Sequence, residues 1–326
     1  MKYVRFGKTE MTVSRLCLGG MMFSRKIDLE GTRRVIDEAI ANGINFIDTA
    51  ESYGESEDFI GQALQGRREK VYLATKVYKR RAGESAGRNS RANTELSLDH
   101  SLQQLRTDRI DLYQLHHPDP RTPLDETLAA LDRAVKAGKV RYVGVTNHYS
   151  WQMAWMIARA QNLGFDPIVS IQCRYNVLDR VVETETVPMV TRFGLAMMAY
   201  APLCGGMLSG KYQRGQTRQP GTRSQEDKKL QKLLSNDRAF DVIDRMKDLA
   251  RRQQLELPQL AMLWLMAKPY LTTPILGGSR LEHFQMMYAV ADRSLPVEIV
   301  SEIDAMSEPF IYRAFENQPM REGPPL

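Results

Sequence analysis

The chain alternates between short apolar runs and longer stretches in which apolar residues recur at helical spacing. In the first unit, residues 16–19 form an apolar run, and Asp28 then precedes a helical stripe that closes at Gly43. The apolar runs predict strands over residues 16–19, 45–50, 71–76, 110–116, 141–146, 168–172, 195–200 and 273–277. Such strand-then-helix units in one row predict a closed (β/α)8 barrel, the TIM-barrel architecture.

The remaining segments complete this prediction. A β-hairpin is expected over residues 3–13, with its turn at 7–10. Residues 201–235 are predicted to form a long loop at the carboxyl end of the barrel, and the tail from Tyr312 is also expected to be loop. Because no linker or low-complexity segment interrupts the pattern, we expect one barrel domain over 1–326. Helices are predicted near 28–43, 58–64, 90–105, 124–135, 151–157, 181–193, 240–249, 258–267 and from residue 281.

The main alternative is a doubly wound dinucleotide-binding sheet. That fold carries the glycine fingerprint G-x-G-x-x-G directly after its first strand. Here the first loop reads Leu-Gly-Gly-Met-Met-Phe over residues 18–23, so the fingerprint is absent. The barrel therefore remains the favoured architecture.

Composition narrows the class of protein. The chain is 43% hydrophobic and 26% charged, which is typical of a globular protein. No signal-peptide pattern opens it, and no apolar run approaches the ~18 residues of a membrane span. Cys17, Cys173 and Cys204 lie far apart and are odd in number, which indicates reduced thiols and neither a disulfide framework nor a zinc site. We expect a cytoplasmic protein without membrane contact.

The net charge of +6 comes with two local excesses of Lys and Arg, within residues 79–91 and 211–229. A solvated surface is one interpretation, and attraction of a small molecule that carries phosphate is the sharper one. Nucleic acid is not favoured as a partner, because no aromatic interleaving or recognised motif accompanies the charge.

Four residues with useful chemistry fall at the carboxyl ends of three neighbouring predicted strands. Asp48 is at the tip of the second strand, and Tyr53 is in the loop beyond it. Lys76 ends the third strand, and His116 ends the fourth. Active sites of eight-stranded barrels are built at this face, so the joint placement indicates a catalytic site.

This set suits proton donation to a carbonyl. Tyr53 is the candidate acid, and a nearby Lys76 is expected to lower the tyrosine pKa. Asp48 is expected to pair with Lys76, since a buried cation needs a partner. His116 is expected to orient the carbonyl oxygen, whereas His117 is expected to face away by strand alternation. No serine-hydrolase elbow and no metal-binding H-E-x-x-H motif is present, so no metal is expected.

With these residues in place, the chain resembles an aldo-keto reductase. The resemblance extends from the opening hairpin to the last strand and its helix. A segment at 205–212, Gly-Gly-Met-Leu-Ser-Gly-Lys-Tyr, resembles the branch that includes bacterial reductases and potassium-channel β-subunits. The other motifs are Asp48-Thr49-Ala50-x-x-Tyr53-Gly54, Ala74-Thr75-Lys76, Leu115-His116-His117-Pro118-Asp119, Gly144-Val145-Thr146-Asn147, Ala199-Tyr200-Ala201-Pro202-Leu203 and Gly277-Gly278-Ser279-Arg280.

The resemblance implies NADPH as cofactor, with NADH as the alternative, and a small carbonyl compound as substrate. Asn147 and Gln172 are expected to bind the nicotinamide carboxamide, and Tyr200 to stack on the ring. Ser279 and Arg280 are expected to meet the 2′-phosphate at a helix start. The other expected cofactor contacts are Gly20, Met21, Thr146, Ala201, Pro202, Leu203, Cys204, Gly205, Lys211, Arg223, Gly277 and His283.

One departure from the family pattern concerns the adenine site. Members usually carry Glu-Asn in the final helix, where this chain has Met286 and Met287, and His283 stands where Gln or Arg is common. The activity implied is reduction of an aldehyde or ketone, with a pathway-specific ketoreductase as a variant of the same chemistry. A nicotinamide-binding regulatory subunit with little turnover is the alternative from another class. The sequence gives neither the substrate nor the oligomeric state.

Overall fold

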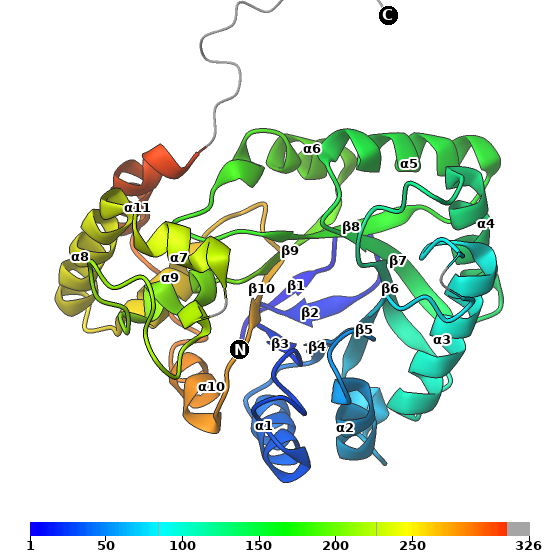
Figure 1. Cartoon of the computed structure of the whole chain (residues 1–326), viewed down its shortest axis with the longest axis horizontal. Helices are drawn as coiled ribbons and strands as arrows, with labels where there is room; N and C mark the ends of the chain where they lie inside the picture. Colours follow the sequence, from blue (N-terminus) through cyan, green and yellow to red (C-terminus); the bar gives the residue numbers. More distant parts are fainter. Residues whose placement is uncertain (84, 226, 312–326) are drawn as a thin grey trace, which may run out of the picture.

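The computed structural model describes residues 1–83, 85–225 and 227–311. Eight parallel strands close into a barrel in the order β10-β3-β4-β5-β6-β7-β8-β9, which confirms the predicted (β/α)8 architecture. Helices lie around the outside of this ring (Figure 1). The strands are β3 (Cys17–Gly19), β4 (Phe46–Asp48), β5 (Tyr72–Val77), β6 (Ile110–Leu115), β7 (Val140–Thr146), β8 (Ile168–Arg174), β9 (Ala196–Tyr200) and β10 (Thr273–Leu276).

The helices fall close to the predicted stripes. Asp28 caps α1 by accepting a hydrogen bond from the N–H of Gly31, as expected for an N-cap aspartate. Pro258 lies in the first turn of α9, where its missing N–H has no cost. The helices are α1 (Leu29–Ala41), α2 (Ser56–Ala63), α3 (Arg91–Leu105), α4 (Leu124–Lys136), α5 (Ser150–Leu163), α6 (Thr186–Phe193), α7 (Lys228–Leu234), α8 (Asp237–Arg252), α9 (Leu257–Met266), α10 (Leu281–Tyr288) and α11 (Val297–Ser307).

Two predicted segments were wrong in detail. The helix predicted over 181–193 is split into a 3₁₀ turn, η2 (Val181–Glu183), and α6. Pro188 explains the break, because proline is tolerated in the first turn of a helix but not in its interior. The predicted loop 201–235 contains η3 (Cys204–Ser209), η4 (Arg223–Gln225) and α7. Helix α11 was also missed, and the predicted tail from Tyr312 lies outside the described residues.

The predicted hairpin closes the amino end of the barrel. Strands β1 (Tyr3–Arg5) and β2 (Thr12–Ser14) pair antiparallel, and they lie across the middle of the ring (Figure 1). Phe6 is fully buried and packs edge-on against Phe46 of β4 at a centroid distance of 5.5 Å. Because these side chains fill the amino end of the barrel, a ligand enters from the carboxyl end.

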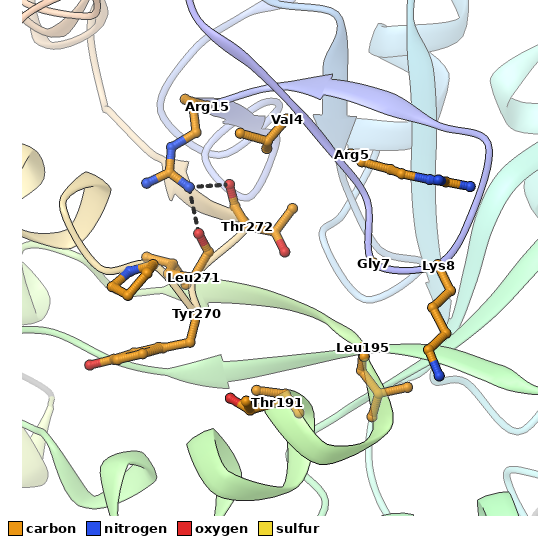
Figure 2. Close-up of a pocket in the computed structure, with 13 residues that line it drawn as sticks. Val4, Arg5, Gly7, Lys8, Arg15, Thr191, Leu195, Tyr270, Leu271 and Thr272 are labelled. Carbon is orange, nitrogen blue, oxygen red and sulfur yellow. Dashed lines mark hydrogen bonds between the residues drawn. The ribbon is translucent and has the colours of Figure 1, made fainter.

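A cavity of about 380 Å³ lies beside the hairpin, lined by residues that include Lys8, Arg15 and Thr191 (Figure 2). The Arg15 guanidinium donates to the carbonyls of Leu271 at 2.5 Å and Thr272 at 3.1 Å. Arg15 thereby ties the start of β3 to the start of β10. This cavity is at the amino end and is not part of the site formed by the strand tips.

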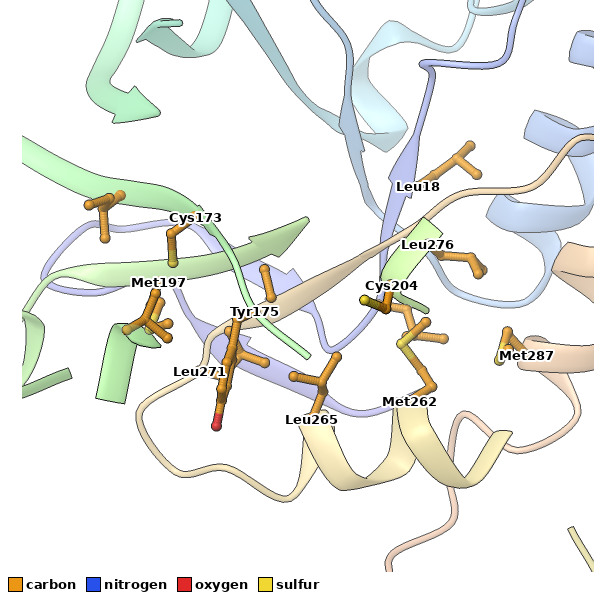
Figure 3. Packing of buried hydrophobic residues seen from close by; sticks show 14 of the residues in the cluster. Leu18, Cys173, Tyr175, Met197, Cys204, Met262, Leu265, Leu271, Leu276 and Met287 are labelled. Carbon is orange, nitrogen blue, oxygen red and sulfur yellow. The ribbon is translucent and has the colours of Figure 1, made fainter. Parts of the chain in front are cut away.

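All three cysteines are buried and unpaired, as the sequence indicated. Cys173 and Cys204 pack with aliphatic and methionine side chains of β9, β10 and α9 (Figure 3). Burial raises the pKa of Cys173 to about 12 and that of Cys204 to about 11. These thiols therefore act as core residues. Within the described ranges, no helix is both long and apolar enough to cross a membrane.

Candidate active site

The four candidate catalytic residues come together at the carboxyl ends of β4, β5 and β6. Asp48 is the last residue of β4, and Lys76 lies one residue before the end of β5. Tyr53 is in the turn that leads from β4 to α2. His116 was predicted as the last residue of its strand, but β6 ends at Leu115 and His116 follows it.

A buried ion pair lies at the centre of this group. The Nζ atom of Lys76, which is fully buried, donates to Oδ2 of Asp48 at 2.6 Å and to the carbonyl of Thr49 at 2.7 Å. Burial by itself would lower the pKa of Lys76, but the charge and hydrogen bond of Asp48, together with Tyr53 and Cys17, outweigh burial and the pKa is raised. The ammonium is therefore held in its charged form, as the predicted pair requires.

Two side-chain amides hold the other oxygen of Asp48. Gln172 donates to Oδ1 at 2.8 Å and Gln114 donates to it at 3.1 Å. Sequence reasoning assigned Gln172 to the cofactor and missed this contact. It also missed Gln114, whose signal is a polar residue in the buried run of β6, two positions before His116. Both amides thus fix the orientation of the Asp48 carboxylate.

Tyr53 lies over the cation. Its ring centroid is 5.1 Å from Nζ of Lys76. Burial raises the pKa of Tyr53 by more than Lys76, acting in the predicted direction, lowers it, so the net shift is upward and not toward neutral pH. The phenol therefore keeps its proton at neutral pH and is available as a donor.

His116 is held as a neutral imidazole beside the tyrosine. Its ring is edge-on to Tyr53 at 5.9 Å. Burial, followed by the charges of Lys76 and His117, lowers the pKa of His116 to about 3. The prediction that His117 faces away is wrong, because the two rings stack at 5.0 Å with planes 2° apart. Strand alternation does not apply to them, since β6 has already ended.

The residues expected around the nicotinamide lie on the next strand tips. Asn147 follows β7 with a positive φ of 61°. Its amide donates to the carbonyl of His116 at 3.1 Å, and its oxygen accepts from the Tyr200 hydroxyl at 2.8 Å. The buried hydroxyl of Thr146 has no partner in the described part of the chain, so a hydrogen-bonding position remains open there.

The segment after β9 turns repeatedly with left-handed backbone. Positive φ occurs at Ala201, Cys204, Gly205, Gly206 and Gly210, whereas Pro202 and Leu203 lie between the first two. A Cβ on Gly206 would lie 2.8 Å from Cε of Lys211, so the lysine covers the bare face of this glycine. The N–H groups of Cys204 and Gly206 donate to the carbonyls of Ala201 and Leu203 within the turn, so the Lys211 ammonium is its candidate donor to an anion.

Cations gather between this turn and the start of α10. Burial and the charge of Arg223 lower the pKa of Lys211. Burial, Arg280 and Lys211 lower the pKa of His283, which accepts a hydrogen bond from Arg280 at 3.0 Å. Neither Lys211 nor Arg223 pairs with a described carboxylate. An anionic group would relieve this repulsion, so these residues fit the phosphates of a dinucleotide.

Two of the glycines predicted to contact the cofactor follow strand ends at the rim of the barrel. Gly20 follows β3, and a Cβ there would meet the Ser56 hydroxyl at 2.8 Å, which leaves room only for glycine. Met21, directly after it, is partly exposed. Gly277 faces open space with no atom within 4 Å of an added Cβ, as expected where the protein backbone lies close to a ligand.

Comparison with known proteins decides the family. The model of the Aldo/keto reductase family matches residues 15–308. The chain belongs to the aldo/keto reductase family. It is 37% identical over 314 residues to the uncharacterized oxidoreductase YrpG of Bacillus subtilis, covering 92% of this chain and 94% of that protein. It is 29% identical to the aldo-keto reductase YhdN of the same organism, covering 94% of each chain.

One plant relative is named as a channel subunit and not as a reductase. The probable voltage-gated potassium channel subunit beta of Arabidopsis thaliana is 30% identical over 295 residues, which cover 87% of this chain and 89% of that protein. Both kinds of relative match the branch that the 205–212 segment indicated. As a member of this family, the protein is an NAD(P)H-dependent oxidoreductase.

Proposed function

We propose that this aldo/keto reductase converts an aldehyde or ketone to the alcohol, with NADPH as the preferred cofactor. The observation that carries the proposal is the buried Lys76–Asp48 pair directly beneath the Tyr53 ring. The bound cofactor supplies a hydride to the carbonyl carbon. The protein has to orient the carbonyl, deliver one proton to its oxygen and stabilise the charge that is left behind.

Each of the four residues has a step in this scheme. Tyr53 donates its phenolic proton to the carbonyl oxygen as negative charge develops there. The neutral ring of His116 offers hydrogen bonding to the same oxygen and fixes its position. The ammonium of Lys76 stabilises the tyrosinate that remains, and Asp48 keeps that ammonium in place. A solvent proton then restores the phenol.

A preference for NADPH is supported by the cations near the start of α10. Its additional phosphate adds negative charge, and Arg280 and Lys211 supply positive charge close to His283. A charge-assisted contact of this kind stabilises a complex by about 1.5–3 kcal/mol. We therefore expect the Kd for NADPH to be at least tenfold lower than that for NADH, measured by quenching of protein fluorescence.

The direct test is oxidation of NADPH, followed at 340 nm, over a panel of aldehydes, ketoses and quinones, with NADH measured beside it. Turnover of at least one carbonyl class that depends on the enzyme supports the proposal. If the protein binds the cofactor and oxidises it with no compound of the panel, the reductase proposal is wrong.

The second candidate is a regulatory subunit that binds nicotinamide and senses redox state, suggested by the plant relatives named as channel subunits. The four candidate residues do not separate the two functions, because a sensor can use the same hydride transfer slowly. Negligible turnover together with a membrane protein partner in a pull-down would favour this second function. High turnover without such a partner favours the reductase.

A further inference from the structure

The loop between β5 and α3 borders the space in front of the candidate catalytic imidazole. Tyr78 follows the last residue of β5. Its ring lies 5.3 Å from the His116 ring and 5.9 Å from the His117 ring. A substrate whose carbonyl reaches Tyr53 and His116 therefore has Tyr78 at its side.

A cation lies over the ring of that tyrosine. The guanidinium carbon of Arg88 is 5.1 Å from the Tyr78 ring centroid, within cation–π range. Arg88 is half-buried and forms no ion pair with a carboxylate in the described ranges. The carboxylate of Asp119 nearby accepts instead from the N–H of Asn89 at 2.9 Å and from the Thr122 hydroxyl at 2.7 Å. Arg88 thus has hydrogen-bonding capacity left for an external anion.

The loop that carries Arg88 is fixed by one buried side chain. Asn93 of α3 is fully buried, and its amide donates to the carbonyls of Lys79 at 2.8 Å and Arg88 at 2.7 Å. Its oxygen accepts from the N–H of Ala82 at 3.1 Å. Both ends of the loop are therefore held before any ligand binds, which reduces the entropy cost of using Arg88 for recognition.

A second cation lies on the Tyr53 side of the site. On the Tyr53 side, Arg25 donates to the carbonyl of Ser52 at 3.0 Å and pairs with no described carboxylate. His117 adds no charge at neutral pH, since burial and Arg88 lower its pKa. The mouth therefore attracts anions.

We propose that Arg88, stacked on Tyr78, binds a carboxylate or phosphate group of the carbonyl substrate. The preferred substrates are then short aldehydes or ketones that carry an anionic group at the end away from the carbonyl. This inference rests on the proposed reductase function and names its substrate class. Guanidinium suits both anions, because its planar fork can form two parallel hydrogen bonds.

The test compares pairs of substrates that differ in charge. For carboxylate, 4-carboxybenzaldehyde is compared with methyl 4-formylbenzoate, and for phosphate, glyceraldehyde 3-phosphate is compared with glyceraldehyde. The quantity measured is the ratio of kcat/KM for the anionic to the neutral member. The variant is Arg88→Gln, and the control is Arg91→Gln, which removes an equal charge nearby from an exposed arginine paired with Glu95.

We expect a ratio well above one for the wild type in at least one pair, which identifies the preferred anion. Arg88→Gln lowers that ratio about tenfold or more, mostly through KM, and Arg91→Gln leaves it near the wild-type value. A wild-type ratio near one, or an equal change in both variants, overturns the assignment of Arg88. Absence of turnover with all four compounds and with the wider panel contradicts the reductase function itself.

Discussion

Burial determines the protonation of the residues that face the substrate. The pKa of Tyr53 is raised because loss of solvent outweighs the charge of Lys76, and the pKa of His116 falls to about 3 for the same primary reason. Both residues are therefore neutral at physiological pH. A neutral phenol can donate a proton, and a neutral imidazole can hydrogen-bond a carbonyl oxygen without transferring charge to it.

This protonation predicts the pH dependence of reduction. We expect kcat/KM for the carbonyl to be constant from about pH 5 to pH 9, because His116 stays neutral and Tyr53 stays protonated over that range. The rate should fall only at higher pH, as the phenol loses its proton. A titration near pH 6.5 that disappears in His116→Gln would contradict the neutral imidazole.

For single residues of the site, the sequence predicted where a side chain lies better than which groups it contacts. The Asp48–Lys76 pair followed from two strand tips that had to be neighbours, and it is present. The stacking of His117 on His116 could not be predicted, because it depends on where β6 stops. The pKa of Tyr53 needed the extent of burial, which is a property of the packed protein.

The element that differs most from its prediction is the segment between β9 and α8. The glycine and arginine residues of this segment indicated a loop. The segment nevertheless contains the helix α7, which Asp227 caps by accepting a hydrogen bond from the N–H of Leu230 at 3.0 Å. A short helix with leucine at 230, 233 and 234 could have been found from this cap and spacing. The left-handed residues before it depend on tertiary contacts and have no comparable signal.

This segment gives a prediction about cofactor affinity. In Gly206→Ala, the new methyl group lies only 2.8 Å from Lys211 Cε, at a residue with φ of 97°, so the lysine side chain has to move. We expect the Kd for NADPH to rise about tenfold, because the displaced ammonium moves away from the position proposed for the phosphates.

Gly215→Ala is the matched control, since Gly215 also has positive φ, of 78°, but no atom within 4 Å of an added Cβ. Both variants should lose about 1 kcal/mol of unfolding free energy from backbone strain. Equal NADPH affinity in the two variants would show that Lys211 does not act through this contact.

At the scale of the whole molecule, an apolar cluster that stabilises the barrel and the candidate active site lie at opposite ends. The hairpin and the lower barrel interior form one apolar cluster around Phe6, Phe46 and Leu112, whereas the candidate site is built at the opposite end. The alternation of strands and helices specified this architecture almost completely. What it did not specify is the depth of the site, because side-chain burial follows from closure of all eight strands.

A substitution at the closed end tests this separation. Phe6→Ala removes a fully buried ring that contacts Phe46, so the free energy of unfolding in urea should fall by about 3–5 kcal/mol. Tyr3→Ala, at a residue that is 49% exposed and donates one hydrogen bond to the Gly43 carbonyl, is the control and should lose only about 1 kcal/mol. The kcat at 25 °C should stay within about twofold in both variants. A large loss of kcat in folded Phe6→Ala would mean that the two ends are coupled.

The central claim is that Tyr53 supplies the proton. Tyr53→Phe removes one hydroxyl and leaves the Lys76–Asp48 pair and the cofactor contacts in place. In single-turnover experiments with saturating NADPH and the best aldehyde of the panel, the rate of NADPH oxidation should fall at least 100-fold, because general acid catalysis contributes about that much. The Kd for NADPH should remain within about twofold. A rate close to that of the wild type, in a variant that still binds NADPH, would contradict the account.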